Sequence, residues 1–230
     1  MRITFLGYSS FLVDTGGHLL LFDYAPRRLR RESDPLLRRL LAGRHCTVFV
    51  SHAHPDHFDP AIYDLPDCSY VVSEDTPAQR GAQIAAPDTM FVLDDLSIRT
   101  FRSTDLGVAY LLRADGKTLY HAGDLNWWHW DEASEEENAA MKQAFLAQAE
   151  KLVRAPIDLA FLTADPRQKD AWLWGFDHLL REGRIAHAVP MHFWNIKSTP
   201  QRVHDAACCA PYRERIVTGL VQCGDTIVLP

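Results

Sequence analysis

The sequence predicts a layered α/β protein. Short apolar segments typical of β-strands recur along the whole chain, and helical patterns are mixed with them only after the first three strands. The 230 residues suffice for one large domain with a substantial buried core, and hydrophobic residues make up 47% of them. We find no internal repeat, low-complexity tract or linker, so residues 1–230 are expected to form a single domain.

Three strand-like segments open the chain, at residues 2–7, 10–15 and 18–24. The dipeptide Gly16-Gly17 separates the second segment from the third, and glycines at this spacing favour a tight turn. The second and third segments are therefore expected to form a β-hairpin.

A helix is predicted at residues 34–43, followed by a buried strand. Asp34 is a residue type that caps helix N-termini, Pro35 fits the first turn, and Gly43 is suited to ending the helix. The apolar segment CTVFV at residues 46–50 then predicts a strand in the core.

The middle of the chain is expected to add strands and one short helix. The predicted elements are a strand at 69–73, a short helix at 76–84 and a strand at 89–95. Residues 106–124 follow, with two strand-like segments on either side of Asp115-Gly116, a dipeptide that favours a hairpin turn.

Residues 134–153 carry the longest helix signal. Ser134 and Glu137 match a capping box, and the acidic first turn suits the positive end of the helix dipole. The remaining predicted elements are a strand at 157–164, a helix at 170–183, a strand at 186–193, a helix that starts at Thr199-Pro200 and a strand at 225–229.

The segment SHAHPDHFDP, which directly follows the CTVFV strand, crowds metal-binding side chains together. His52 and His54 alternate along an extended loop, so they point the same way and can bind one ion. Asp56 and His57 lie on the next bend and can bind a second ion. Imidazoles and carboxylates are ordinary ligands of zinc, manganese and iron. Four such residues at this spacing are a far more specific signal than one histidine, which is usually a core or surface residue.

Four segments together resemble the metallo-β-lactamase fold superfamily of metal-dependent hydrolases. FLGYSSFLVDTGGHLLLFDY resembles that superfamily's opening strands and leads to Asp23, and SHAHPDHFD matches its metal motif. YHAGDLN resembles its later Gly-Asp motif, and PMHF resembles its last ligand motif. The resemblance covers nearly the whole chain, and the order of the motifs is similar to that in the small single-domain branch that contains the ascorbate-6-phosphate lactonase.

This resemblance implies a four-layer αββα sandwich, in which two mixed β-sheets are flanked by helices. It also implies that Asp124 bridges two metal ions and that His192 is a ligand of the second. Asp56, Asp124 and His192 are accordingly the expected catalytic residues: Asp56 would orient the nucleophile, and His192 would lie near the leaving oxygen.

The chain departs from the family pattern at the third histidine of the first site, which the superfamily usually supplies shortly before the bridging aspartate. No histidine lies between His57 and His121. Asp105 is one candidate replacement, because it is a hard oxygen ligand that precedes a strand. His121 is the other, although a supporting or core role is an equally good interpretation of it. If neither binds, the first site has only three ligands.

Three further aspartates are candidates for holding the metal-binding histidines, because such histidines usually donate their other N–H to a carboxylate or carbonyl. Asp23 and Asp165 follow apolar strands, and Asp59 adjoins the metal motif. For Asp59, a helix cap before Pro60 is the competing interpretation.

The late loops are rich in tryptophan, and they are expected to surround the metal site. An aromatic pocket there would suit a ligand with an apolar or ring-shaped part, and packing in the core is the alternative. Arg167, Lys169 and Lys197 lie in the same loops and can hold a carboxylate or phosphate, unless they are simply solvated. The tryptophans are Trp127, Trp128, Trp130, Trp172, Trp174 and Trp194.

The function favoured by the sequence is metal-dependent hydrolysis of a small-molecule ester, lactone or phosphodiester. One or two divalent ions are expected, zinc first, with manganese or iron as alternatives. The net charge of −6 and the lack of a basic insert argue against a nucleic-acid substrate. Two hypotheses from other classes stay open: a metal-binding sensor or scaffold without hydrolysis, and a di-iron redox protein.

The sequence also predicts a cytoplasmic protein. No apolar segment is long enough to span a membrane, and the N-terminus has no signal-peptide pattern. The five cysteines are odd in number and show no CxxC spacing, which favours reduced thiols.

Overall fold

Strand β4 (Cys46–Val50) is buried along its whole length, so both of its faces need a covering layer. Phe49 packs into a core that includes side chains of a second sheet, whereas Val48 and Val50 pack into another core with helix α1 (Asp34–Leu41). A strand that is apolar on both faces therefore requires a layer on each side of its sheet.

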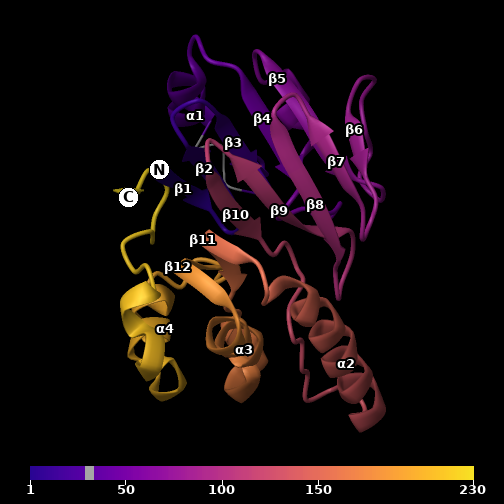
Figure 1. The fold of residues 1–230 in the computed structure, drawn as a ribbon, viewed down its shortest axis with the longest axis vertical. Coiled ribbons are helices and arrows are strands. Elements are labelled where there is room, and N and C mark those ends of the chain that lie inside the picture. Colours follow the sequence, from indigo (N-terminus) through magenta and orange to yellow (C-terminus); the bar gives the residue numbers. More distant parts are fainter. Residues whose placement is uncertain (29–33) are drawn as a thin grey trace.

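The computed structural model describes residues 1–28 and 34–230. Figure 1 shows two β-sheets that lie against each other, with α1 beside the first sheet and α2, α3 and α4 beside the second. Each sheet contains both parallel and antiparallel strand pairs. The structure confirms the αββα sandwich with two mixed sheets.

The first sheet has seven strands in the order β13-β1-β2-β3-β4-β5-β6. Strands β1, β2 and β3 form two antiparallel hairpins, and the pairs from β3 to β6 are parallel. The chain's last strand, β13, pairs with its first, which brings the two ends of the chain together. The bounds are β1 Arg2–Gly7, β2 Ser10–Asp14, β3 Leu19–Phe22, β5 Cys68–Ser73, β6 Gln83–Ala85 and β13 Thr226–Val228.

The second sheet has six strands in the order β12-β11-β10-β9-β8-β7. The strands from β7 to β10 form an antiparallel meander, and β10, β11 and β12 are parallel to one another. The bounds are β7 Met90–Leu93, β8 Leu96–Arg102, β9 Val108–Ala114, β10 Lys117–His121, β11 Pro156–Thr163 and β12 Arg184–Met191.

The helices cover the outer faces of the sheets, and most of them lie where the sequence predicts them. The capping box of α2 is confirmed, because Ser134 Oγ accepts from the backbone N–H of Glu137, whose side chain accepts from the N–H of Ser134. The cap predicted at Asp34 concerns a side chain outside the described residues. The other helix bounds are α2 Glu135–Leu152, α3 Trp174–Glu182, α4 Thr199–Asp205 and the 3-10 helices η1 Pro60–Asp64, η2 Pro166–Ala171 and η3 Ala207–Arg215.

Two expectations for the middle of the chain are wrong or incomplete. The short helix predicted at residues 76–84 is absent, and this segment instead leads into β6, which pairs with β5. Gly81 has a φ of +92°, a left-handed conformation that interrupts a helix, and strand pairing satisfies the backbone that follows. Strand β8 was not predicted, although Leu96 and Ile98 alternate inward along it.

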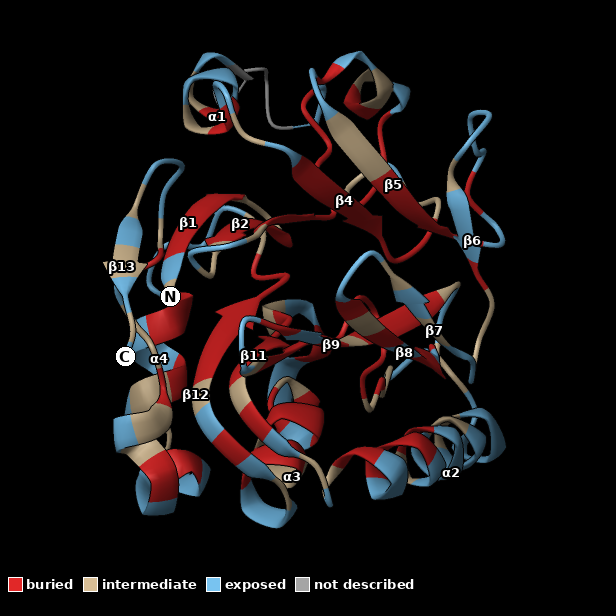
Figure 2. Cartoon of the chain, turned by 45° about the horizontal axis from the view of Figure 1, so that its top comes forward, coloured by how far each residue is buried: buried red, intermediate tan, exposed pale blue. Residues whose placement is uncertain are grey.

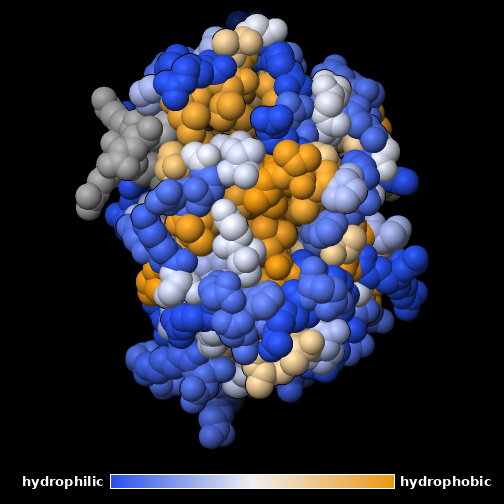
Figure 3. Space-filling model, turned by 90° about the vertical axis from the view of Figure 1, so that its left-hand side faces the viewer, coloured by the Kyte–Doolittle hydropathy of each residue, from blue (hydrophilic) through white to orange (hydrophobic). Residues whose placement is uncertain are grey.

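Many strand residues of both sheets are buried, as Figure 2 shows, and their apolar side chains form two cores. The larger core joins both sheets to α2, α3 and α4, and the smaller one lies between the first sheet and α1. Figure 3 shows the face that carries the two ends of the chain, where an apolar area is surrounded by polar side chains. Among the described residues, no helix is both long and apolar enough to cross a bilayer.

Two hairpin turns, far apart in the sequence, are joined by the carboxylate of Asp115. This residue lies in the turn between β9 and β10, and its Oδ2 accepts hydrogen bonds from Thr15 Oγ1 at 2.5 Å and from the N–H of Gly17 at 2.9 Å. A Cβ added to Gly17 would lie 2.6 Å from Asp115 Oδ1, so a larger residue there would displace this carboxylate. The hydrogen bond from Thr15, with those of His18 and Gly17, lowers the pKa of Asp115 to about 2.

We expect Asp115→Asn to lower the free energy of unfolding by about 1–2 kcal/mol at pH 7, because a charged acceptor of several hydrogen bonds is lost. Since the folded-state pKa lies below the ordinary value of 3.8, this contribution is complete above about pH 4 and disappears as the pH falls towards 2. Urea unfolding of both proteins at several pH values measures the difference. Asp95→Asn is the control, because that exposed carboxylate contacts only His18 among the described residues. An effect of Asp115→Asn that is no larger than the control, or that grows at low pH, would contradict this account.

Candidate metal centre

The predicted ligands come together where parallel strands of both sheets end. The chain turns out of the sheet at Asp23 after β3, at His52 after β4, at Asp124 after β10, at Asp165 after β11 and at His192 after β12. Carboxyl ends of parallel strands meet at one edge of a sheet, and the two packed sheets bring their edges together. The crevice at this edge is therefore where the site forms.

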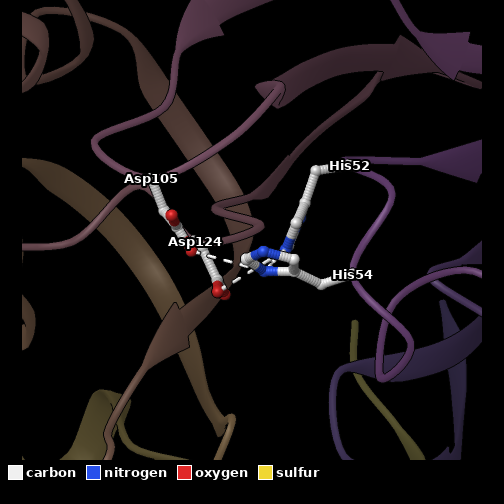
Figure 4. A group of neighbouring side chains, drawn as sticks. All are labelled: His52, His54, Asp105 and Asp124. Carbon is white, nitrogen blue, oxygen red and sulfur yellow. Dashed lines mark hydrogen bonds and ion pairs between the residues drawn. The ribbon is translucent and has the colours of Figure 1, made fainter. Parts of the chain in front are cut away.

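One group consists of His52, His54, Asp105 and Asp124, whose nitrogen and oxygen atoms lie within 4.8 Å of one another. His52 Nε2 lies 3.1 Å from His54 Nδ1 and 3.6 Å from Asp124 Oδ2. Asp105 Oδ2 lies 3.4 Å from His54 Nδ1. Figure 4 shows the two histidines and the two aspartates pointing toward a common centre from different segments of the chain.

A second group lies beside the first and consists of Asp56, His57 and His192. His192 Nε2 lies 3.5 Å from Asp56 Oδ2 and 3.5 Å from Asp124 Oδ1, and His57 Nε2 lies 3.3 Å from the same Asp124 oxygen. Asp124 therefore faces the first group with Oδ2 and the second with Oδ1. All seven predicted ligands are found in these two neighbouring groups.

Two histidines of the metal motif, His52 and His57, are held from behind by Ser51 and Asp23. Asp23 accepts hydrogen bonds from the N–H of Ser51, from Ser51 Oγ and from His57 Nδ1, each at 2.7 Å. Ser51 Oγ also lies 2.9 Å from His52 Nδ1. With Nδ1 used in this way, His52 and His57 both present Nε2 to the centre.

Asp165 holds His192 in the same manner. Its Oδ2 accepts from His192 Nδ1 at 3.1 Å, so the Nε2 atom of this histidine faces the centre. Arg167 in turn donates to both oxygens of Asp165. Asp59, the third candidate for holding a histidine, instead acts as a helix cap: its side chain accepts a hydrogen bond from the N–H of Ala61 at the start of η1.

The carboxylates of the centre favour positive charge. Burial opposes ionisation of Asp23, but the neighbouring imidazoles of His121 and His57, together with the hydrogen bond from His57, outweigh it and lower the pKa of Asp23 to about 2. Burial likewise opposes protonation of His192, but Asp124, with Asp165 and Asp56, raises its pKa to about 10. Such raised affinity for a proton marks a place where a cation is stabilised.

Two buried atoms of the centre have no hydrogen-bond partner among the described residues: His57 Nε2 and Asp124 Oδ1. They face each other at 3.3 Å, and His57 has already donated from Nδ1 to Asp23. A lone pair and a carboxylate oxygen that are buried together cost free energy unless a cation lies between them. The donor set of imidazole nitrogens and carboxylate oxygens thus fits a divalent metal ion.

His121 lies behind the centre. Its Nε2 donates to the carbonyl of Ser9 at 3.0 Å, and its Nδ1 accepts from the N–H of Gly123 at 3.2 Å. The ring is fully buried and stacks on Phe22, with centroids 5.0 Å apart and planes within 3°. Both nitrogens are therefore used by the backbone, whereas Asp105 faces His54.

Two glycines, whose role was not recognised from the sequence, allow these segments to approach. A Cβ at Gly107 would lie 2.0 Å from the carbonyl oxygen of Ser51 and 2.8 Å from His52 Cβ, and a Cβ at Gly123 would lie 2.7 Å from Ser51 Cβ. Their φ values of +63° and +52° also favour glycine. Ser51 was likewise missed. The signal was the serine at the start of the metal motif and the glycines two residues after Asp105 and one before Asp124.

A cavity of about 310 Å³ opens over the two ligand groups. Among the side chains that line it are Trp128, Trp130, Trp194 and Arg167, together with His54, Asp56, Asp105, Asp124 and His192. Of the other tryptophans, Trp127 and Trp174 line a separate, larger cavity, and Trp172 packs against the core. The late loops thus contribute three of the six tryptophans to the metal pocket.

Residues 2–141, more than half of the chain, match the family model described as Beta-lactamase superfamily domain. The chain therefore belongs to the β-lactamase superfamily. Its sandwich of two mixed sheets with helices outside them is the metallo-β-lactamase fold. One curated relative, named UPF0173 metal-dependent hydrolase, comes from Opitutus terrae; it is 27% identical, and the match covers 84% of this chain and 85% of the relative.

Solved structures share this fold over the full length of the chain. Igni18, a metallo hydrolase of the archaeon Ignicoccus hospitalis, has a TM-score of 0.68 at 18% identity, with 100% of this chain and 98% of that one covered. An isothiocyanate hydrolase from Delia radicum gut bacteria has a TM-score of 0.57 at 15% identity, with 100% and 99% covered. At these identities the likeness establishes the fold.

We expect Gly107→Ala to destabilise the protein by about 3–5 kcal/mol, because the new methyl group collides with backbone at Ser51. Gly43→Ala is the matched control: its φ of +75° is similar, but a Cβ there meets nothing within 4 Å. This control is expected to cost only about 1–2 kcal/mol, from the left-handed conformation alone. Urea unfolding measures both losses, and equal losses would show that close approach to Ser51 is not the constraint.

Proposed function

We propose that the chain hydrolyses a small-molecule ester, lactone or phosphodiester at a centre of two divalent ions. The observation that carries this proposal is the orientation of Asp124, whose two oxygens face two separate ligand groups. In the proposal, the first ion is bound by His52, His54 and Asp105, the second by Asp56, His57 and His192, and both by Asp124.

When bound, the ions would polarise the scissile carbonyl or phosphoryl oxygen and lower the pKa of a water molecule towards neutrality. The side chain of Asp56 is 15% exposed and lines the pocket, so its carboxylate can orient a water and accept its proton. His192 lines the same pocket. Because Asp165 holds its Nδ1, we place its Nε2 edge near the leaving oxygen.

The size of the pocket supports a small-molecule substrate. Its volume of about 310 Å³ is at the lower end of the range for small-molecule sites. Three indole rings form part of its wall, which suits a substrate with an apolar or planar portion. The net charge of −6 argues against a nucleic acid.

Zinc is the ion we propose, because two histidines with carboxylates form an ordinary zinc ligand set. Asp105 adds an oxygen where the family pattern has a histidine, which also makes manganese or iron acceptable. The two half-sites differ in exposure: the side chains of His54 and Asp105 are 42% and 40% exposed, whereas those of His57 and His192 are 0% and 4% exposed. We therefore propose that the second ion is held more tightly than the first.

Metal analysis tests this order of affinity. We expect the purified, zinc-loaded protein to contain about two ions per chain and a limiting amount of chelator to remove one before the other. Asp105→Ala should retain about one ion after dialysis, because only the exposed half-site is impaired. Mass-spectrometric metal analysis gives the stoichiometry. His45→Ala, which changes an exposed histidine outside the centre, should keep both ions. Loss of both ions from Asp105→Ala would contradict the assignment.

Assays with ester, lactone and phosphodiester substrates test the reaction itself. Hydrolysis should stop when a chelator removes the ions and return when zinc is restored. Asp56→Asn, compared with the wild type at equal metal content, should lower kcat by at least about 100-fold, because proton transfer by a placed carboxylate is lost. Turnover that survives complete metal removal would refute the proposal. No turnover at full metal content would favour a sensor or scaffold, and iron with oxygen consumption would favour a redox protein.

We further propose that residues 1–230 act as one domain in the cytoplasm. The larger core contains side chains from both sheets, which supports a single folding unit. Cys46 and Cys209 are buried thiols that form no disulfide, which supports a reducing compartment.

A further inference from the structure

Arg167 differs from the other basic residues of the late loops, because it alone of the three that the sequence singled out lines the metal pocket. Lys169 Nζ forms an ion pair with Asp131, at 2.5 Å. Lys197 donates to Gln222 and lines another cavity. The question is what a cation does in a pocket whose other charged groups are metal ligands.

The guanidinium group of Arg167 is held along one edge by hydrogen bonds to Asp165, and it lies near the rings of Trp194 and Trp130. Nε donates to both oxygens of Asp165, at 3.0 and 2.9 Å, and Nη2 donates to Oδ2. The group lies 4.3 Å from the ring centroid of Trp194 and 5.8 Å from that of Trp130. A planar cation held in this way loses little conformational entropy when it binds a further acceptor.

The opposite edge of the guanidinium is available. Nη1 makes no hydrogen bond within residues 1–28 and 34–230, and half of the side chain is exposed. Asp56 and Asp124 line the same pocket and are close enough to Arg167 to help raise its pKa. Arg167 is therefore a preorganised donor beside the proposed reaction centre.

We propose that Arg167 is a specificity-determining residue that recognises a carboxylate or phosphate group of the substrate. That anion would accept hydrogen bonds from the Nη1 edge, and a planar part of the substrate would lie among the indole rings that line the pocket. This inference rests on the proposed function, since the scissile bond must reach the metal centre at the same time. It narrows the substrate class to anionic small molecules.

The charges of the pocket make this recognition dependent on the metal. Without ions, the carboxylates of Asp56, Asp105 and Asp124 repel an anion, and Asp165 neutralises Arg167. With two divalent ions bound, the pocket becomes attractive to negative charge. The competing explanation is that Arg167 only orients Asp165, and through it His192.

Calorimetric binding separates these explanations. The probes are 4-hydroxybenzoate, phenyl phosphate and neutral 4-hydroxybenzamide, titrated into zinc-loaded protein. The wild type should bind at least one of the anions about ten-fold or more tightly than the amide, since a charge-assisted hydrogen bond is worth about that much. The preference should fall about ten-fold in Arg167→Met, fall less in Arg167→Lys and stay intact in Lys169→Met. The two anions tell carboxylate from phosphate recognition.

Rates of hydrolysis give a second test of anion recognition, with esters whose leaving groups are built on the 4-hydroxybenzoate skeleton of the probes. The substrates are 4-acetoxybenzoate and its neutral methyl ester, and the measured quantity is the ratio of their kcat/KM values. Arg167→Met is expected to lower both rates, because Asp165 loses its partner, but also to lower the ratio about ten-fold. A purely positioning role would lower both rates equally and leave the ratio unchanged.

The outcomes distinguish failure of this inference from failure of the proposed function. Metal content is measured for every variant, and affinities are compared at equal metal occupancy. Equal affinity of the wild type for anions and amide would overturn the role of Arg167. An anion preference as large in Arg167→Met as in the wild type would also overturn it, because the ions alone would then bind the anion. Absence of turnover with an intact, Arg167-dependent preference would refute hydrolysis and leave anion recognition standing.

Discussion

Asp23 is almost fully buried at the end of β3, and its carboxylate accepts three hydrogen bonds from Ser51 and His57. These bonds pin the start of the metal motif to the neighbouring strand and aim the histidines at the centre. Asp23 itself adopts a left-handed conformation, with φ of +45°, which for a residue other than glycine costs about 1–3 kcal/mol. The hydrogen-bond network offsets that strain, so both the local fold and the geometry of the centre depend on this carboxylate.

The second sheet can complete the centre only because its loops come very close to Ser51. Gly107 and Gly123 occupy positions where a methyl group would collide with the metal-motif segment. They bring Asp105 and Asp124 opposite the histidines, while Asp165 and Arg167 hold His192 from the far side. Rigid support on both sides produces two adjacent ligand groups with one shared carboxylate, the arrangement that two-ion hydrolysis requires.

Most of the fold could be predicted from local sequence patterns. Strands such as CTVFV, the hairpin at Asp115-Gly116 and the capping box at Ser134 carry signals that depend on a few neighbouring residues. The helix expected at residues 76–84 was wrong because pairing with β5 outweighed a weak local preference. Strand β8 was missed because its inward apolar series stops after Leu96 and Ile98, where the next inward position is Thr100. In both cases a partner strand decided the conformation.

The sequence by itself determined four of the candidate ligands, because SHAHPDHFD is contiguous and its chemistry can be recognised without a structure. Only the tertiary structure makes Asp105 the better candidate ligand than His121, because the surroundings of the two residues differ. His121 is buried with both nitrogens bonded to backbone, whereas Asp105 faces His54. The same holds for Arg167. In the sequence, Lys169 and Lys197 looked equally able to hold an anion, and only the structure places Arg167 in the pocket. Ligand type is a property of one residue, whereas direction and accessibility depend on segments that meet only when the two sheets pack together.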